Sequence, residues 1–187
     1  MARRHIHYEQ AFEDFLRSHS IPYIAVDEAK RAILPDLDVK NADFIVHTAS
    51  GLNLIVDVKG KRFPYEHCGR RTYWESWIHA EDLEGLAIWR SLLGERFEAL
   101  LVFAYWIRNL ADPRVDGLLF STLHQYRDRD YAFVAVRLDD FARLFRERSK
   151  SWNAVDMAAR KFESVLVPFG ALVGRKEELE LTGKASS

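Results

Sequence analysis

The amino-acid sequence predicts one mixed α/β domain with a central β-sheet covered by helices. Helical and strand-like hydrophobic patterns alternate along the chain, and neither an internal repeat nor a Gly/Ser linker divides it. The run FEALLVFAYWI, residues 97–107, is almost wholly apolar, as expected for a strand buried on both faces of a sheet. A chain of 187 residues, 48% of them hydrophobic, is long and apolar enough for one sizeable core. We expect one domain over residues 1–175 and a flexible tail over 176–187.

The first part of the chain predicts a helix followed by a β-hairpin. Residues 6–18 carry apolar side chains at helical spacing, and an extended run follows over residues 18–26, where Pro22 is tolerated at the start of a strand. Residues 27–41 form a polar connection with a candidate helical stretch before Pro35. The segments DFIVHT and LNLIVDVK are rich in β-branched residues and are joined by the short turn ASG, which predicts a hairpin.

The rest of the chain predicts a crossover helix, two strands and further helices. Residues 76–94 read as a long helix that Gly94 caps, long enough to connect the hairpin to a parallel strand at 98–106. Before it, we expect an irregular basic loop over residues 60–73. After it, the predicted elements are a strand over 131–138, a helix over 139–149 with Asp139 or Asp140 as N-cap, and a helix over 154–166.

Bulk composition excludes several classes of protein but does not point to a partner. The formal net charge of −1 gives no overall sign of nucleic-acid binding. No apolar run approaches the ~18 residues of a membrane span, and the N-terminus lacks the apolar region of a secretory signal, so we expect no membrane association. With Cys68 as the single cysteine, an internal disulfide is excluded, and a cytoplasmic location is the natural expectation.

Charged residues interrupt both strands of the predicted hairpin. Side chains alternate along a strand, so Asp57 and Lys59 share one face while Val58 points to the other. With the turn near residue 51, Asp43 lies roughly opposite positions 57–59 and can reach the same face. Two carboxylates and an amine then meet at one end of the hairpin. Mg²⁺ commonly binds one or two carboxylates and keeps several waters, and the carbonyl of Val58 is a further candidate ligand.

Taken alone, the Asp57–Lys59 triplet is more typical of a solvated strand than of a site, so the context decides its interpretation. In the first predicted helix, Glu9 lies at the margin of the apolar face, and Glu13 lies one turn later and further toward solvent. Either acid is consistent with an ordinary helix surface or with a side chain that reaches a shared site. The basic loop over residues 60–73 follows the triplet directly, although a cluster of basic residues on its own is also typical of a solvated surface.

Together these residues resemble the PD-(D/E)XK nuclease superfamily, which has a restriction-endonuclease-like core in αβββαβ order. The helix acid is best matched by Glu9, with Glu13 as the second choice. Asp43 matches the first strand aspartate, although Ala42 stands where the family usually has proline. Asp57 and Lys59 match the (D/E)XK element. The resemblance covers roughly residues 5–106.

The resemblance implies a nuclease that uses Mg²⁺ or Mn²⁺ to hydrolyse phosphodiester bonds. Glu9, Asp43, Asp57 and the Val58 carbonyl would bind the metal, and Lys59 would assist the attack of water. The family favours DNA as the substrate, and a homodimer is common among its members. A catalytically inactive nucleic-acid-binding or assembly module is the alternative. The residues expected to contact nucleic acid follow the site in the sequence; they are Lys61, Arg62, Arg70, Arg71, Tyr73 and Trp74. Trp77 is either a further stacking residue or part of the core.

Overall fold

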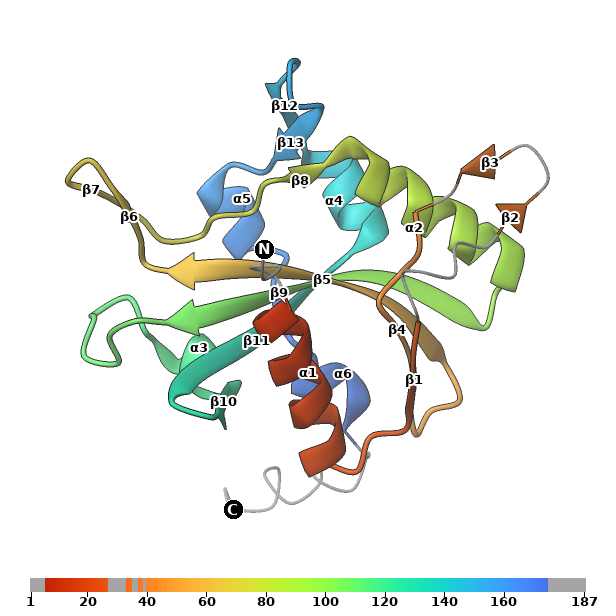
Figure 1. The fold of residues 1–187 in the computed structure, drawn as a ribbon, viewed down its shortest axis with the longest axis horizontal. Coiled ribbons are helices and arrows are strands. Elements are labelled where there is room, and N and C mark those ends of the chain that lie inside the picture. Colours follow the sequence, from red (N-terminus) through yellow and green to blue (C-terminus); the bar gives the residue numbers. More distant parts are fainter. Residues whose placement is uncertain (1–5, 27–32, 35–36, 39, 175–187) are drawn as a thin grey trace, which may run out of the picture.

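A seven-stranded mixed sheet forms the centre of the molecule, with helices on both faces (Figure 1). The computed structural model describes residues 6–26, 33–34, 37–38 and 40–174. Neighbouring strands follow the order β1-β4-β5-β9-β11-β10, and β14 also pairs with β11. Their bounds are β1 Tyr23–Ala25, β4 Phe44–His47, β5 Asn53–Phe63, β9 Phe97–Ile107, β10 Leu123–Tyr126, β11 Arg129–Arg137 and β14 Val167–Pro168.

The parallel pair β5–β9 lies at the centre of the sheet. The two strands pair without interruption from Asn53↔Phe97 to Phe63↔Ile107, and the other pairs in the sheet are antiparallel. Helix α2 (Ala80–Leu93) makes the crossover between them, as the sequence predicted. Gly94 ends this helix with φ 84°, and its N–H donates to the Arg90 carbonyl, which confirms the predicted cap.

The two faces of the sheet bury separate apolar clusters. Helix α1 (Ile6–Ser18) packs on one face, where the Phe12 ring is fully buried and meets the rings of Phe44, Phe133 and Phe169 edge-on. Helix α6 (Phe169–Val173) completes that layer. On the other face lie α2, α4 (Leu138–Leu144) and α5 (Ala159–Glu163), so that the sheet is enclosed as predicted. None of the helices in the described ranges is long and apolar enough to cross a membrane.

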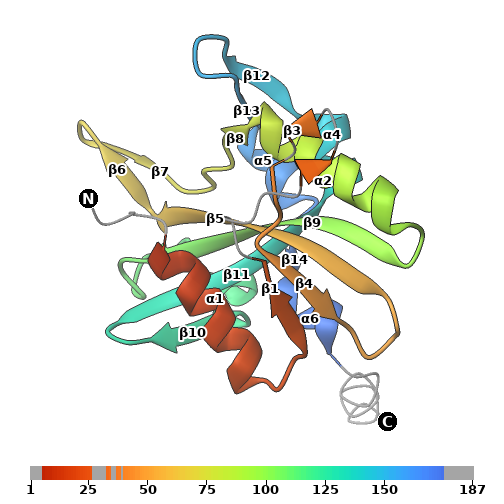
Figure 2. The ribbon, with the colours of Figure 1, turned by 45° about the vertical axis from the view of Figure 1, so that its right-hand side comes forward.

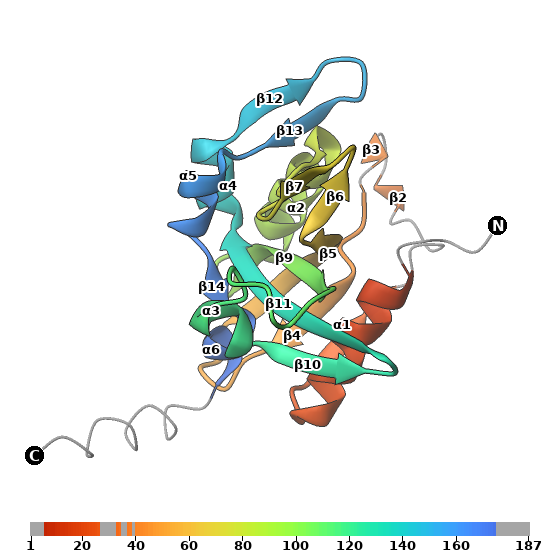
Figure 3. The same ribbon diagram turned by 90° about the vertical axis from the view of Figure 1, so that its left-hand side faces the viewer.

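Two hairpins project beyond these layers (Figures 2 and 3). The first joins β6 and β7 directly after β5, and the second joins β12 and β13, which pairs in turn with β8. Short elements complete the described chain; they are β2 Ile33–Leu34, β3 Leu37–Asp38, β6 Tyr65–His67, β7 Arg70–Thr72, β8 Ile78–His79, α3 Gly117–Phe120, β12 Arg146–Ser149 and β13 Ala154–Asp156.

Several element boundaries differ from the sequence prediction because of distant pairing. The expected irregular loop at 60–73 is wrong, since β5 continues beside β9 as far as Phe63 and the β6–β7 hairpin follows. The crossover helix begins at Ala80 rather than residue 76, because Ile78 is drawn into a strand pair with Val155. That pairing also replaces the start of the helix expected at 154–166 with β13.

The helix expected at 139–149 is shorter than predicted and has a different cap. Helix α4 occupies Leu138–Leu144 with Arg137 at the N-cap, so neither predicted aspartate caps it, and its expected last turn is strand β12. The predicted boundaries of α1 and β9 are confirmed; β1 lies within its predicted extended segment, and β11 begins two residues before the predicted strand 131–138 and ends one residue before that strand's predicted end. Most of the 27–41 connection and the predicted tail lie outside the described residues, and the described Ile33–Leu34 is strand rather than helix.

Candidate active site

The predicted charges meet where β4 begins beside β5. The β4–β5 ladder ends at the pair Phe44↔Val56, and the residue before it, Asp43, hydrogen-bonds to residues 56 and 58 of β5. Val56 and Val58 join the apolar cluster beneath α1, and Asp57 and Lys59 therefore point to the opposite face, toward α2. The predicted alternation along β5 is confirmed, and Asp43 lies beside residues 56–58 of β5, close to the positions expected from the hairpin.

Asp43 is held in place by the backbone of the neighbouring strand. Its Oδ2 accepts the Val58 N–H at 2.6 Å, and its own N–H donates to the Val56 carbonyl. Burial raises the pKa of the Asp43 carboxyl well above its usual value, and the charges of Asp57 and Glu9 raise it further. The Val58 N–H and Lys59 offset only part of that rise. The negative charges of two other carboxylates, Asp57 and Glu9, therefore oppose the ionisation of Asp43.

The Lys59 amine sits between two buried carboxylates. Its Nζ lies 2.7 Å from Asp57 Oδ2 and 3.0 Å from Asp82 Oδ1. Burial lowers the pKa of Lys59, but the attraction of Asp57 and Asp82 outweighs it and leaves the pKa raised, so the amine is protonated at neutral pH. The Lys59 amine is thus the close partner of Asp57 Oδ2, an enclosed oxygen that accepts no further hydrogen bond from the described residues.

Asp82 is a member of this cluster that the sequence analysis missed. It lies in the first turn of α2, where its Oδ2 accepts the His79 N–H at 2.9 Å and its Oδ1 forms an ion pair with Lys40. Burial opposes ionisation of Asp82, yet the charges of Lys59 and Lys40 hold its pKa below the usual value. An aspartate three residues after a helix N-cap was the available signal, but the helix was predicted to start four residues too early.

Comparison with known proteins bears on the fold. The sequence matches no protein-family model, and the search of curated proteins found no match. Among solved structures, the chain is similar to Hjc from Archaeoglobus fulgidus, a Holliday junction resolvase from an archaeal hyperthermophile, with a TM-score of 0.51 and 14% sequence identity. The alignment covers 90% of this chain and 99% of that one. The chain has a restriction-endonuclease-like fold. At this level of identity the likeness establishes the fold alone.

Within this restriction-endonuclease-like fold, the structure separates the two candidate acids of α1. Glu13 accepts hydrogen bonds from Arg17 at 2.6 Å and from the Tyr23 hydroxyl at 2.8 Å, at the edge of the sheet formed by β1. The charge of Glu9, by contrast, contributes to the raised pKa of Asp43. Of the two acids, Glu9 is therefore the one whose charge reaches Asp43, and its role as a site residue stays a prediction.

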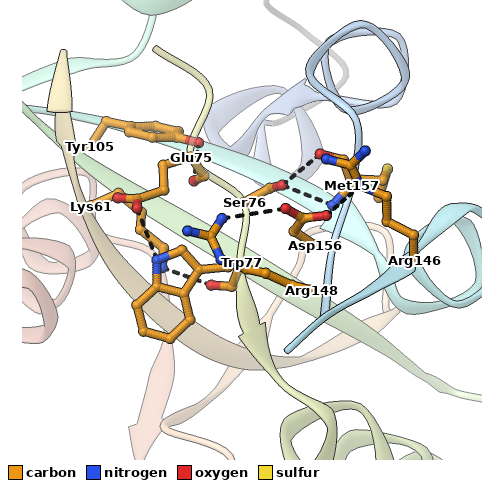
Figure 4. A network of polar contacts seen from close by, with 9 residues as sticks. All are labelled: Lys61, Glu75, Ser76, Trp77, Tyr105, Arg146, Arg148, Asp156 and Met157. Atoms are coloured by element: carbon orange, nitrogen blue, oxygen red, sulfur yellow. Dashed lines mark hydrogen bonds and ion pairs between the residues drawn. The ribbon is translucent and has the colours of Figure 1, made fainter. Parts of the chain in front are cut away.

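Two residues expected to contact nucleic acid are instead buried. Lys61 is 6% exposed; its Nζ donates to the Trp77 carbonyl at 2.7 Å and lies 3.6 Å from the Trp77 ring centroid (Figure 4). Burial lowers the pKa of Lys61 to about 7. Trp74 is 8% exposed and packs edge-on against Phe63 and Tyr105. Both side chains belong to the interior, because Trp77 covers Lys61 and because Trp74 also packs against Phe162 of α5, and the prediction of a nucleic-acid contact is corrected for both.

The other predicted contact residues lie at or near the surface. Arg62 is exposed near the end of β5, and Arg70 and Arg71 are exposed on β7. Arg71 is already engaged by Glu66 at 2.5 Å. Tyr73 is partly buried, with its hydroxyl 3.5 Å from Asp112. The β6–β7 hairpin therefore offers less uncompensated positive charge than its sequence suggested.

The oxygen atoms of the candidate site are of the kind that a hard divalent cation prefers, but the side chains alone do not provide a complete set of ligands. In the described part of the chain, no three His, Cys, Asp or Glu side chains form a metal-binding group. Burial raises the pKa of both the Asp43 and the Asp57 carboxyl, and the enclosed Asp57 Oδ2 has the Lys59 amine as its close partner and accepts no further hydrogen bond from the described residues. Two carboxylates with a backbone carbonyl and water are a coordination that Mg²⁺ accepts. The residues present thus fit a site that a cation completes.

Proposed function

We propose that the chain is a metal-dependent nuclease that hydrolyses phosphodiester bonds, with DNA as its expected substrate. The observation that carries the proposal is the nearness of the Asp43 and Asp57 carboxylates beside an anchored Lys59, on a restriction-endonuclease-like sheet. Acidic groups that repel one another in an enclosed place are costly to the fold, so their presence favours a role in binding a cation.

Glu9, Asp43, Asp57 and the Val58 carbonyl would hold the ion, which we expect to be Mg²⁺ or Mn²⁺. Val56 O and Val58 N both face the β4 edge, where they bond to Asp43, so the Val58 carbonyl points past the end of β4. Such an ion polarises a phosphodiester and lowers the pKa of a bound water.

In this proposal, Lys59 acts as a fixed positive charge. Because Asp57 and Asp82 raise its pKa, the amine remains protonated at neutral pH and cannot serve as a general base. It can donate hydrogen bonds to a phosphate oxygen or to the attacking water. Asp82 does not face the substrate in this scheme; it is a positioning residue that fixes the amine from the opposite side to Asp57.

The decisive experiment is a cleavage assay on labelled linear duplex, single-stranded and four-way-junction DNA, with RNA of the same sequence for comparison. We include the junction because Hjc is described as a Holliday junction resolvase. We expect cleavage with Mg²⁺ or Mn²⁺ and none with EDTA. Asp57→Asn and Lys59→Met should each reduce the rate at least ~100-fold. Glu84→Gln, an exposed change on α2, is the matched control and should leave the rate unchanged.

The alternative function is a nucleic-acid-binding module that does not cleave. It is favoured by the ion pair between Lys59 and Asp57, which already neutralises one expected metal ligand. Absence of cleavage on every substrate, together with binding that Lys59→Met leaves unchanged, would support this module and reject the nuclease. Retention of all four expected charges, Glu9, Asp43, Asp57 and Lys59, favours the enzyme.

A further inference from the structure

Three arginines gather around one indole ring on the face of the sheet opposite Asp57 and Lys59. The guanidinium carbons of Arg129 and Arg108 lie 4.5 Å and 4.6 Å from the Trp106 ring centroid, and that of Arg62 lies 5.9 Å away. Trp106 is partly buried, whereas Arg62 and Arg108 are exposed. We call these four residues the Trp106 cluster.

The register of the sheet brings the Trp106 cluster together. Arg62 of β5 pairs with Trp106 of β9, and Trp106 pairs in turn with Tyr131 of β11. Arg129 lies two residues before Tyr131 and so points to the same face. Arg108 continues from β9, and its N–H donates to the Phe63 carbonyl.

The cluster lies beside the first turn of α1. The His7 ring meets the Trp106 ring edge-on at 5.9 Å. Burial raises the pKa of the Tyr8 hydroxyl, and the positive charges of Arg62 and Arg129 counteract that rise. Because Glu9 follows Tyr8 in the same helix, the cluster borders the candidate active site while presenting its charges on a different face of the sheet.

The positive charge of the Trp106 cluster is little compensated. Within the ranges that the structure describes, neither Arg62 nor Arg108 forms an ion pair, and Arg129 has only a loose 3.8 Å contact with the highly exposed Asp128. Like charges brought this close repel one another, and a bound anion relieves that repulsion. The indole faces attract the guanidinium groups and keep them in place without cancelling their charge.

The basic surface continues from the cluster into a hollow next to the β6–β7 hairpin. This hollow has a volume of about 410 Å³, and three arginines line it, Arg62, Arg71 and Arg108. The two acids that also line it are Glu66 and Asp112, and both approach Arg71, at 2.5 Å and 3.9 Å. Because these two acids approach Arg71, Arg62 and Arg108 remain available to an anion in the hollow.

We propose that the Trp106 cluster binds the phosphate backbone of a nucleic-acid segment that lies away from the scissile bond. The inference rests on the proposed function, because it assumes a nucleic-acid substrate. Guanidinium groups already lie close to the indole, so the cluster offers donors to phosphates rather than a free ring for a base. Binding at this surface is therefore independent of sequence and sensitive to salt.

The test measures the affinity for labelled duplex and four-way-junction DNA by fluorescence anisotropy, in EDTA and over a series of salt concentrations. We expect Arg108→Gln/Arg129→Gln to weaken binding at least ~10-fold and to make the log Kd–log salt slope shallower by about 2, since each lost phosphate contact removes ~0.9. Arg143→Gln/Arg160→Gln, exposed arginines of α4 and α5, makes the same charge change elsewhere and should have little effect.

Trp106→Leu is the second variant, because it keeps the arginines but removes the ring that positions them. It should also weaken binding, while circular dichroism confirms that the fold is retained. Equal effects of the two double variants, or an unchanged affinity in both, would overturn the proposal. Arginine-dependent sedimentation with phosphatidylserine vesicles, combined with unchanged DNA binding, would overturn it in favour of a membrane surface.

Failure of the proposed function has a different outcome. Salt-dependent DNA binding through the cluster without cleavage would reject the nuclease and retain the binding surface. Cleavage by a protein whose affinity does not depend on Arg108 and Arg129 would retain the nuclease and reject the surface. Wild-type protein that binds no nucleic acid at all would reject both.

Discussion

Lys59 Nζ lies 3.0 Å from Asp82 Oδ1, an ion pair that ties strand β5 to the first turn of α2. The side chain of Asp82 is 1% exposed, and its second oxygen caps the same helix through the His79 N–H. One carboxylate thus fixes both the start of the crossover helix and the position of the candidate catalytic amine.

We predict that Asp82→Ala destabilises the protein strongly. It leaves Lys59 with one buried partner fewer and removes the helix cap, and breaking a buried ion pair from one side typically costs about 3–5 kcal/mol. Urea unfolding measures the loss of unfolding free energy. The exposed Glu84→Ala on the same helix is the control and should stay within about 0.5 kcal/mol of wild type.

The cost of losing Asp82 should also depend on pH. Its pKa is lowered in the folded state, so the stabilisation is present above the unfolded value of ~3.9 and is lost as the pH falls through the folded value. The stability difference between wild type and Asp82→Asn should therefore be full at pH 7 and shrink below about pH 4. A difference that stays constant down to pH 3 would show that Asp82 acts through packing alone.

Asp43→Asn should have the opposite effect on stability while abolishing cleavage. The pKa of Asp43 is raised in the folded state, so its ionisation opposes folding, increasingly as the pH rises from ~3.9 through the folded value. Asparagine removes that charge and retains an oxygen for the Val58 N–H. We expect a gain of about 1 kcal/mol at pH 7 that shrinks toward pH 4, measured by urea unfolding.

The control for this substitution is Asp128→Asn, which removes an exposed carboxylate and should leave stability unchanged at both pH values. A loss of stability in Asp43→Asn at neutral pH would mean that the carboxylate charge supports the fold rather than a bound ion, and would weaken the argument for a cation site.

Lys61 predicts a second pH dependence, in the alkaline range. Burial lowers its pKa to about 7, far below the unfolded value of ~10.4, so the charged amine opposes folding and wild-type stability should rise with pH between these values. Lys61→Met lacks this contribution. The stability advantage of Lys61→Met over wild type should therefore fall with increasing pH, by up to about 1.4 kcal/mol per unit between pH 8 and 10.

Urea unfolding at pH 7, 8, 9 and 10 provides the measurement, and Lys150→Met, which changes an exposed lysine, is the control. Parallel pH profiles for wild type and Lys61→Met would contradict the burial of a titrating amine beneath Trp77.

The parts of the fold that the sequence predicted are those governed by local pattern. The apolar spacing over 6–18 defines α1, and the continuous apolar run 97–107 defines β9, since each pattern is complete within its own element. Alternation along β5 likewise predicted that Asp57 and Lys59 share one face.

The other features of the fold depend on contacts between residues that are far apart in the sequence, and a local sequence pattern does not reveal such contacts. Lys61 has the same strand parity as Lys59, yet it lies beneath Trp77, 16 residues later in the chain. Strand β8 exists because Ile78 meets Val155. Trp106 lies near the end of a strand that was expected to be covered on both faces, but arginine side chains from three separate places in the sequence lie around its ring, next to His7 of α1.

Gly60 provides the last prediction, because the first turn of α1 rests directly on it. A Cβ built at Gly60 would lie 2.1 Å from the ring of Tyr8, so the ring and the helix turn that carries Glu9 must shift to admit any side chain. We expect Gly60→Ala to lower the unfolding free energy by about 1–3 kcal/mol, the usual cost of overpacking, and to slow cleavage as Glu9 moves from Asp43. Gly117→Ala, where a Cβ meets nothing within 4 Å, is the matched control and should be tolerated. In the Tyr8→Ala background the cost of Gly60→Ala should largely disappear, because the clash is with that ring; a cost that persists there would place the strain elsewhere.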